Sequence, residues 1–312
     1  MNLEENILRR LIESPERLSG ELLAKELKVS RVAIWKSIKK LKEKGYPIDT
    51  AKRGYFLENK DILLKEDLRS LISKSKLFTE VVHLWETPST MEVAKALAEA
   101  GQRAIVIAER QTKGRGRMNR DWDSPQGGIW LTFVLLEPFP LKRSFLLTYL
   151  ASVATAKAII DVTKLAAKVK WPNDVLVAGK KVAGILLEIK AEVDALVYAL
   201  VGIGINVNNP VEGKPYLLPA SSLRELTGEL ITRKNLLERL ISCFEDSFFN
   251  LERLLEEWRD LSETLGKEVK IKTFQEEIVG YALDLSPDGA LLVKTKEGHI
   301  KNVFSGDCIH LR

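Results

Sequence analysis

Cysteine and histidine are scarce in this 312-residue sequence, which has two cysteines, Cys243 and Cys308, and three scattered histidines, His83, His299 and His310. Both cysteines lie in mostly apolar surroundings without framework spacing or a reactive motif. A disulfide or a cysteine nucleophile is therefore disfavoured, and tolerated or buried free thiols are expected. The scattered histidines do not form a zinc ligand cluster. A metal, if one is used, is expected to arrive with a nucleotide as Mg²⁺.

Long hydrophobic runs are also absent. The first ten residues mix both charges before an apolar run develops, which is not the pattern of a signal peptide. The most hydrophobic stretch, residues 144–156, is bounded by Arg143 and Lys157 and is too short to cross a bilayer. Apolar residues make up 45% of the chain, and its length favours two or three domains. We therefore expect a soluble, cytoplasmic protein with no membrane partner.

The excess positive charge is confined to the N-terminal fifth of the chain. Residues 1–60 contain 14 Lys and Arg against 9 Asp and Glu, which accounts for the whole net charge of +5. The remaining residues are electrically balanced. This asymmetry indicates that the N-terminal segment contacts phosphates.

The same segment has the pattern of a winged helix-turn-helix. Apolar spacing predicts helices over residues 2–13, 21–27 and 31–44, with Ser19 and Ser30 as N-caps. Two short strands, residues 48–50 and 54–57, follow around a basic tip. The residues expected to face DNA are Ser30, Arg31, Trp35, Lys36, Lys39, Lys40, Lys52 and Arg53. The alternative is a solvated basic helix on an ordinary helical domain.

The remainder predicts an α+β protein with three domains, at residues 1–60, 67–264 and 265–312. Residues 58–66 are polar and charged, and we interpret them as a linker. Helices are expected at residues 89–100, 143–162, 222–228 and 234–261. Strands are expected at residues 81–85, 105–108, 130–136, 169–171, 181–189 and 195–207. In the tail, short alternating strands split by turns at residues 286–289 and 296–298 are typical of a small barrel.

The most informative segment runs from Gln111 to Gly128 and contains Gly114-Arg-Gly-Arg. The glycines at 114 and 116 permit unusual backbone shapes and close approach, and Arg115, Arg117 and Arg120 supply planar cations for phosphate or carboxylate. The physical interpretation is an anion held under a flexible loop. Taken alone, such a string also occurs in solvated loops and RNA-binding tails.

Two further motifs supply context. Lys170-Trp-Pro-Asn-Asp is followed by Lys180-Lys-Val-Ala-Gly-Ile-Leu-Leu-Glu, and Gly202-Ile-Gly-Ile-Asn-Val-Asn ends a strand. With the arginine-rich segment they resemble the signatures of biotin protein ligases. The basic N-terminal unit and the barrel-like tail extend the resemblance over essentially the whole chain, to the bifunctional ligases that also repress a biotin operon. It implies a winged helix-turn-helix, a mixed-sheet catalytic domain resembling class II synthetases, and a C-terminal SH3-like barrel.

The resemblance also implies residue roles. Arg117, Lys181 and Asp174 would be catalytic, with Asp174 also a ligand of Mg²⁺, and Asn173 and Asn206 would contact the nucleotide. Biotin or its adenylate would contact Ser89, Thr90, Met91, Gln111, Gly114, Arg115, Gly116, Arg117, Arg120, Trp122, Lys181, Gly184 and Gly204. Met91 is a departure, because the family often has a polar residue there. The implied ligands are ATP, Mg²⁺ and biotin, and the implied partners are biotin carboxyl carrier protein, operator DNA and a second copy of the chain bound through the central sheet.

Other interpretations remain open. Ser89 is also a plausible helix cap, Asn173 and Asp174 suit a turn, Lys181 suits a surface strand, and the glycines after residue 201 suit close packing. Two functional alternatives are a lipoate-type ligase and a ligand-sensing regulator without ligase activity. The P-loop string Gly-x4-Gly-Lys is absent, which disfavours an ordinary P-loop enzyme.

Overall fold

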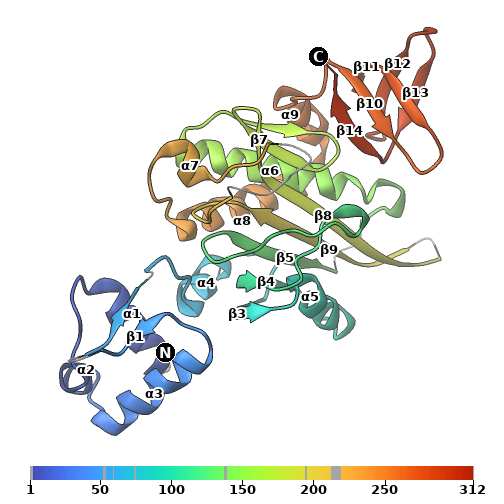
Figure 1. The fold of residues 1–312 in the computed structure, drawn as a ribbon. Coiled ribbons are helices and arrows are strands. Elements are labelled where there is room, and N and C mark those ends of the chain that lie inside the picture. The colour runs from blue at the N-terminus through green and yellow to red at the C-terminus, as the bar shows by residue number, and fades with distance from the viewer. Residues whose placement is uncertain are drawn as a thin grey trace.

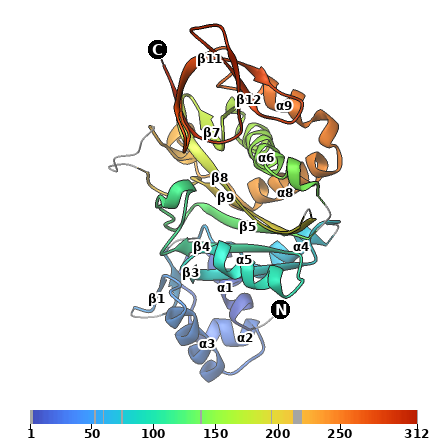
Figure 2. The ribbon, with the colours of Figure 1, turned by 90° about the vertical axis from the view of Figure 1, so that its right-hand side faces the viewer.

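The computed structural model describes residues 3–51, 54–58, 60–73, 75–136, 139–193, 195–211 and 219–311. It contains a two-stranded, a seven-stranded and a five-stranded sheet, arranged in that order along the chain. The N-terminal unit and the C-terminal sheet lie at opposite ends of the central sheet (Figures 1 and 2).

The N-terminal unit is a helix-turn-helix followed by a two-stranded hairpin. Its helices are α1 (Leu3–Glu13), α2 (Gly20–Glu26) and α3 (Arg31–Glu43), and its strands are β1 (Ile48–Asp49) and β2 (Phe56–Leu57). Ser19 and Ser30 cap α2 and α3 as predicted, because their side chains accept hydrogen bonds from the third backbone N–H of each helix. The predicted wing residues Lys52 and Arg53 lie outside the described residues.

The segment predicted to be a polar linker is instead packed into the protein. Ile62, Leu63 and Leu64 are buried, and helix α4 (Lys65–Ile72), which the sequence analysis missed, begins directly after them. The backbone N–H of Leu63 donates a 2.8 Å hydrogen bond to the carboxylate of Glu109. The segment still connects the two units, but it is packed rather than solvated, because Ile62 and Leu64 join the core of the N-terminal unit and Leu63 joins the core of the central unit.

The central sheet has the strand order β3-β4-β5-β9-β8-β7-β6. Among the described strands of this sheet, β3 and β4 are parallel neighbours, and helix α5 (Thr90–Glu99) connects them. The other neighbouring pairs are antiparallel. Strand β7 was not predicted, because its first residue, Asp174, is also the last residue of a motif that suits a turn. The strand bounds are β3 Glu80–Thr87, β4 Ala104–Gln111, β5 Ile129–Leu135, β6 Ala167–Lys170, β7 Asp174–Val177, β8 Lys180–Glu192 and β9 Ala195–Ile205.

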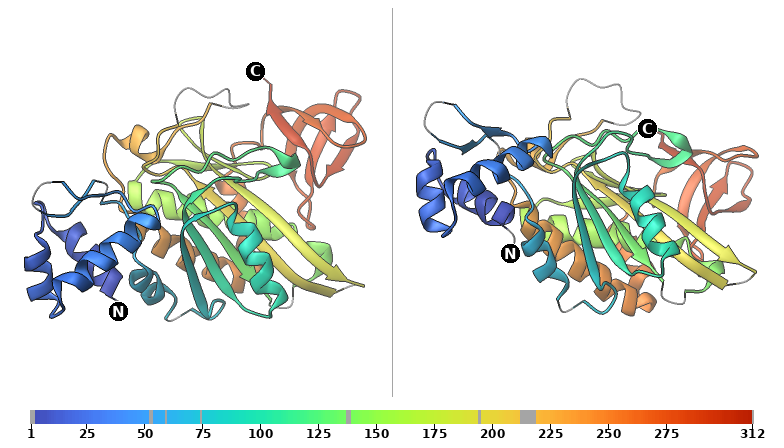
Figure 3. Two further views of the ribbon diagram at one scale, coloured as in Figure 1. Left: turned by 60° about the horizontal axis from the view of Figure 1, so that its bottom comes forward. Right: turned by 90° about the horizontal axis from the view of Figure 1, so that it is seen from below.

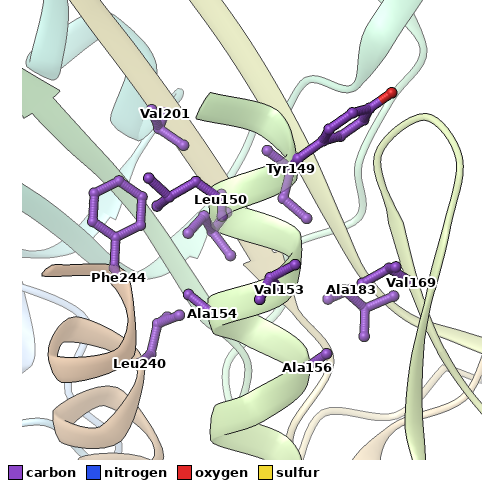
Figure 4. Close-up of a cluster of buried hydrophobic side chains, with 14 of the residues drawn as sticks. Tyr149, Leu150, Val153, Ala154, Ala156, Val169, Ala183, Val201, Leu240 and Phe244 are labelled. Carbon is purple, nitrogen blue, oxygen red and sulfur yellow. The ribbon is translucent and has the colours of Figure 1, made fainter. Parts of the chain in front are cut away.

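Helices cover the two faces of this sheet unequally (Figure 3). Helix α5 packs on one face, whereas α6 (Leu146–Thr163) and α8 (Arg233–Phe249) pack on the other. In Figure 4, Leu150 and Ala154 of α6 lie beside Phe244 and Leu240 of α8. In the described part of the chain, α6 is the one helix long and apolar enough to span a membrane, but 67% of it is buried inside the protein. Its apolar character is therefore explained by its position in the core.

The helix predicted over residues 234–261 is broken in two. Helix α8 ends at Phe249, and a 3-10 turn (Leu251–Arg253) leads into α9 (Leu254–Asp260). Asn250 causes the break, since its backbone is non-helical and its side-chain amide donates a 2.7 Å bond to the carbonyl of Asp246. The short helix α7 (Leu223–Thr227) was predicted, and Ser222 and Glu225 form a capping box at its start.

The C-terminal unit is a five-stranded antiparallel sheet in the order β13-β12-β11-β10-β14. The predicted turns at residues 286–289 and 296–298 are confirmed by short backbone hydrogen bonds from Gly289 to Ser286 and from Gly298 to Thr295. Cys243 and Cys308 are buried free thiols, as predicted. The strand bounds are β10 Glu268–Lys272, β11 Glu277–Leu285, β12 Leu291–Thr295, β13 Ile300–Val303 and β14 Asp307–His310.

A fully buried arginine joins several of these elements. Arg233, the first residue of α8, donates to the carboxylates of Asp61 at 2.7 Å and Glu109 at 2.8 Å, and to the carbonyl of Gly128 at 2.9 Å. Burial raises the pKa of Glu109, but the charge of Arg233 and the contact with His83 outweigh it and hold that pKa below its ordinary value. The ion pair therefore persists in the core at neutral pH.

We predict that Arg233→Met lowers the free energy of unfolding by about 3–5 kcal/mol, because the buried carboxylate of Glu109 loses the guanidinium that balances its charge. Lys234→Met is the matched control, since the adjacent Lys234 has a side chain that is 43% exposed and makes a 3.3 Å ion pair with Asp67. It should cost less than about 1 kcal/mol. Urea unfolding followed by circular dichroism measures both, and equal losses would contradict the importance assigned to the buried pair.

Candidate active site and nucleic-acid interface

A cavity of about 490 Å³ lies on the α5 face of the central sheet and reaches the C-terminal unit. Its floor includes Gly184, Leu186, Gly202 and Gly204, which alternate along β8 and β9 with residues that face α6. Its walls come from the start of α5, the arginine-rich loop and the Trp171–Asp174 turn. Every residue predicted to bind ligand lines this cavity except Gly114.

Gly114 lies behind the cavity wall and closes the base of the loop. Its carbonyl accepts a 2.9 Å bond from the Trp122 N–H. A Cβ at this position would stand 2.3 Å from the carbonyl oxygen of Trp122 and 2.6 Å from the hydroxyl of Ser124. The predicted need for close approach at Gly114 is thus confirmed, whereas Gly116 has an extended backbone and Met118 and Asn119 adopt the left-handed conformation instead.

The loop arginines contact both the catalytic sheet and the C-terminal unit. Arg117 donates to the side-chain oxygen of Asn173 at 3.3 Å and to the hydroxyl of Ser305 at 3.1 Å. Arg120 forms a two-pronged ion pair with Asp307 at the start of β14. Burial lowers the pKa of Arg117, and the carboxylate of Asp307 counteracts part of that effect.

Lys181 and Asp174 form the charged centre of the cavity. Their side chains make a 2.6 Å ion pair, and the ammonium of Lys181 also lies 5.1 Å from the centre of the Trp122 ring. Asp174 is nearly buried, whereas Lys181 is about a quarter exposed. Lys181 is therefore directed into the cavity and is not the surface cation of the alternative interpretation.

Trp122 lies directly over two glycines of the floor. A Cβ on Gly204 would stand 2.4 Å from the indole nitrogen, and one on Gly184 would stand 2.9 Å from the ring. These glycines therefore permit the loop to pack onto the sheet. The indole N–H of Trp122 is buried and has no hydrogen-bond partner among the described residues.

Several predicted ligand residues also have structural roles. Ser89 caps α5 through a 3.3 Å bond from the Met91 N–H, as the capping interpretation predicted. The Asn173 side chain donates a 2.7 Å bond to the carbonyl of Ile185, and the Asn206 side chain accepts a 3.1 Å bond from Asn209. These bonds fix the side chains at the cavity edge, and they leave room for ligand contacts in addition.

The contribution of β14 to the site was not predicted from the sequence. Asp307, Cys308 and Ile309 line the cavity although the tail was interpreted as a separate barrel. Their distance along the chain from the arginine-rich loop hides this contact from local patterns. That Asp307 lies next to the loop arginines is visible only in the tertiary structure.

The predicted DNA-facing residues that the structure describes are all exposed. Ser30, Arg31, Lys36 and Lys40 lie on or next to α3. Trp35 is 56% exposed, and the ammonium of Lys39 lies 5.9 Å from the centre of its ring. An exposed indole among cations is unusual on a merely solvated face, and it suits contact with a nucleic acid backbone.

These features define a class of protein in which a helix-turn-helix unit is joined to an enzyme with an arginine-covered, anion-binding cavity. Three family models match the chain: the biotin/lipoate A/B protein ligase family at residues 86–206, an HTH domain at residues 4–56, and the biotin protein ligase C-terminal domain at residues 264–311. The chain belongs to the family of bifunctional biotin ligases and repressors.

The similar proteins span between two thirds and nearly the whole of the chain. The bifunctional ligase/repressor BirA of Bacillus subtilis is 35% identical over 94% of this chain and 93% of its own length. The biotin–[acetyl-CoA-carboxylase] ligase of Paracoccus denitrificans is 30% identical over 69% of this chain and 94% of its own. The solved biotin protein ligase from Aquifex aeolicus in complex with biotin and ATP is 32% identical, with a TM-score of 0.61 over 75% of this chain and 100% of its own.

We predict that Asp307→Asn makes the arginine-rich loop several times more susceptible to trypsin, because it removes the charge that holds Arg120 against β14. Trypsin cleaves after arginine, and Arg115, Arg117 and Arg120 all lie in this loop. Limited digestion followed by mass spectrometry measures the rate of cleavage. Asp288→Asn, in a turn of the same C-terminal unit, is the matched control. Cleavage at the same rate in both variants would show that the Arg120–Asp307 ion pair does not hold the loop.

Proposed function

We propose that this protein activates biotin with ATP and transfers the biotinyl group to a lysine of biotin carboxyl carrier protein. The observation that carries this proposal is the convergence of Lys181, Asp174 and the loop arginines on one cavity. Family membership makes biotin the acid that is activated. In this arrangement two anionic reactants are held by cations in a partly buried site, where electrostatic stabilisation is strongest.

The cavity offers different chemistry at its two ends. Thr90 and Gln111 present amide and hydroxyl groups that suit the ureido ring of biotin, and Ser89 and Met91 lie beside them. Arg115, Arg117, Arg120, Gly116 and Lys181 would face the carboxylate and α-phosphate, with Asn173 and Asn206 beside the nucleotide. Gly184 and Gly204 would contribute to ligand binding by leaving the space in which Trp122 packs on the cavity floor.

The reaction would proceed in two balanced steps. A carboxylate oxygen of biotin attacks the α-phosphorus of ATP, and the bond to the bridging oxygen breaks to release pyrophosphate. The neutral amine of the acceptor lysine then attacks the acyl carbon, AMP departs with the bridging oxygen, and the amine loses a proton. Arg117 and Lys181 would stabilise charge on the phosphate, and Asp174 would orient the incoming amine.

Mg²⁺ fits the site as an ion carried by the nucleotide. Among the described residues no group of three or more His, Cys, Asp or Glu side chains is arranged to hold a metal. Asp174 would then supply one protein oxygen while phosphates and water supply the others, which is the usual arrangement for this ion. Bound there, the ion would neutralise phosphate charge.

A second function is repression of transcription. The exposed basic surface of α3 would read operator DNA, and two copies joined through the central sheet would place two such helices on paired half-sites. Both activities suit a cytoplasmic protein. A lipoate-type ligase is the closest rival in chemistry, and competition between labelled biotin and lipoate for the cavity distinguishes the two.

We predict that Lys181→Met slows single-turnover formation of the adenylate by about 30- to 1000-fold, since losing one such contact costs roughly 2–4 kcal/mol in the transition state. Lys180→Met is the matched control, because the neighbouring Lys180 is exposed on the same strand and does not line the cavity. Pyrophosphate release measures both rates. Equal rates in the two variants would remove Lys181 from the chemistry.

For DNA binding, we predict that Lys36→Gln and Lys40→Gln each reduce the slope of log affinity against log salt concentration by about one, because each removes one phosphate contact. Fluorescence anisotropy with operator DNA across a salt series measures the slope. Lys296→Gln, in the C-terminal unit, serves as the control. Unchanged slopes for both α3 variants would support the solvated-helix interpretation.

A further inference from the structure

A directional chain of hydrogen bonds runs behind the cavity wall. The hydroxyl of Thr132 donates to the hydroxyl of Thr90 at 2.9 Å, and that hydroxyl donates to the side-chain oxygen of Gln111 at 3.0 Å. The side-chain amide of Gln111 donates to the hydroxyl of Ser124 at 2.9 Å. The Ser124 hydroxyl in turn donates to the carbonyl of Trp122 at 3.0 Å.

The direction of this chain is fixed at both ends. The backbone N–H of Thr90, which can only donate, lies 2.8 Å from the Gln111 oxygen, so the amide of Gln111 has to face Ser124. The carbonyl of Trp122 can only accept. Ser124 must therefore accept from one side and donate to the other at once, which a hydroxyl does and a methyl group does not.

Ser124 and Thr132 act from outside the cavity. Neither side chain lines it, and the two residues are 2% and 0% exposed. Ser124 also pairs with Gln111 through the backbone, because the Gln111 N–H donates to the Ser124 carbonyl at 3.0 Å. The two ends of the arginine-rich loop thus meet at Ser124, and Gly114 packs against its hydroxyl.

We propose that Ser124 is a positioning residue that fixes the orientation of Gln111 toward biotin and joins this recognition to the base of the loop. Without the hydroxyl, the Gln111 amide nitrogen loses its buried acceptor, and only the bonds from Thr90 to the Gln111 oxygen still hold the side chain. Recognition of the ureido ring then weakens while the phosphate-binding cations stay in place. This inference rests on the proposed function, because it assigns biotin to the Gln111 end of the cavity.

The test compares Ser124→Ala with Ser152→Ala. Ser152 is an equally buried serine that donates to the carbonyl of Tyr149 within α6 and does not line the cavity. Ser124→Ala should raise the KM for biotin by roughly five- to twentyfold, which is the loss expected when a buried donor is left unsatisfied. The KM for ATP should change by less than about twofold, and Ser152→Ala should leave both constants unchanged.

A second variant and a double mutant separate positioning from folding. Thr132→Val keeps the side-chain shape, leaves the loop base intact and should raise the KM for biotin by about threefold. In a Gln111→Leu background, Ser124→Ala should add no further loss of biotin affinity, because the two residues act through one another.

Parallel increases in both KM values, or additive losses in the double mutant, would show that Ser124 has only a structural role. Biotin affinity that survives Ser124→Ala unchanged would overturn this inference alone. Failure of the unmutated protein to bind biotin would overturn the proposed function as well.

Discussion

The buried guanidinium of Arg233 is the interaction on which the arrangement of the chain depends. It connects the segment at Asp61, strand β4 at Glu109 and the carbonyl of Gly128 to the first turn of α8. A charge of this kind is stable in the core only when its partners are all in place. Arg233 therefore fixes the segment that connects the DNA-binding unit to the central sheet. Its partner on β4, Glu109, lies two residues before Gln111.

The N-terminal unit is also held against the sheet by aromatic packing. Tyr46 follows α3 and lies 4.3 Å, between ring centres, from Trp85 on β3. Gly45 permits this approach, because a Cβ there would stand 2.3 Å from the indole nitrogen of Trp85. Strand β3 leads within four residues to Ser89 at the cavity. The N-terminal unit and the cavity thus contact the same short segment of chain, from Trp85 on β3 to Ser89 at the start of α5.

Three parts of the chain converge on the cavity itself. The loop brings its arginines, β7 and β8 bring Asp174 and Lys181, and β14 brings Asp307. Cations are held there by carboxylates from separate elements, so the position of each charge depends on the tertiary fold. This dependence also explains why the site could be predicted only in part.

Local patterns predicted the features that local physics determines. The serine caps at residues 19, 30 and 89 and the turns of the C-terminal unit were all found from sequence, and motif resemblance found many of the residues lining the cavity. Partners that meet only in the tertiary fold were missed, because nothing local distinguishes Arg233, Asp307 or Ser124 from other residues of their type. The burial of residues 62–64 was missed for the same reason, since Leu63 bonds to Glu109 and the neighbouring Asp61 bonds to Arg233.

The most direct test of the central claim is intact-protein mass measurement of a biotin carboxyl carrier domain after incubation with this protein, biotin, ATP and Mg²⁺. The account predicts a gain of one biotinyl group on the carrier, no gain without ATP, and none on a carrier whose acceptor lysine is replaced by arginine. An unchanged carrier mass, with the protein folded and biotin bound, would contradict ligase activity and leave a ligand-sensing regulator.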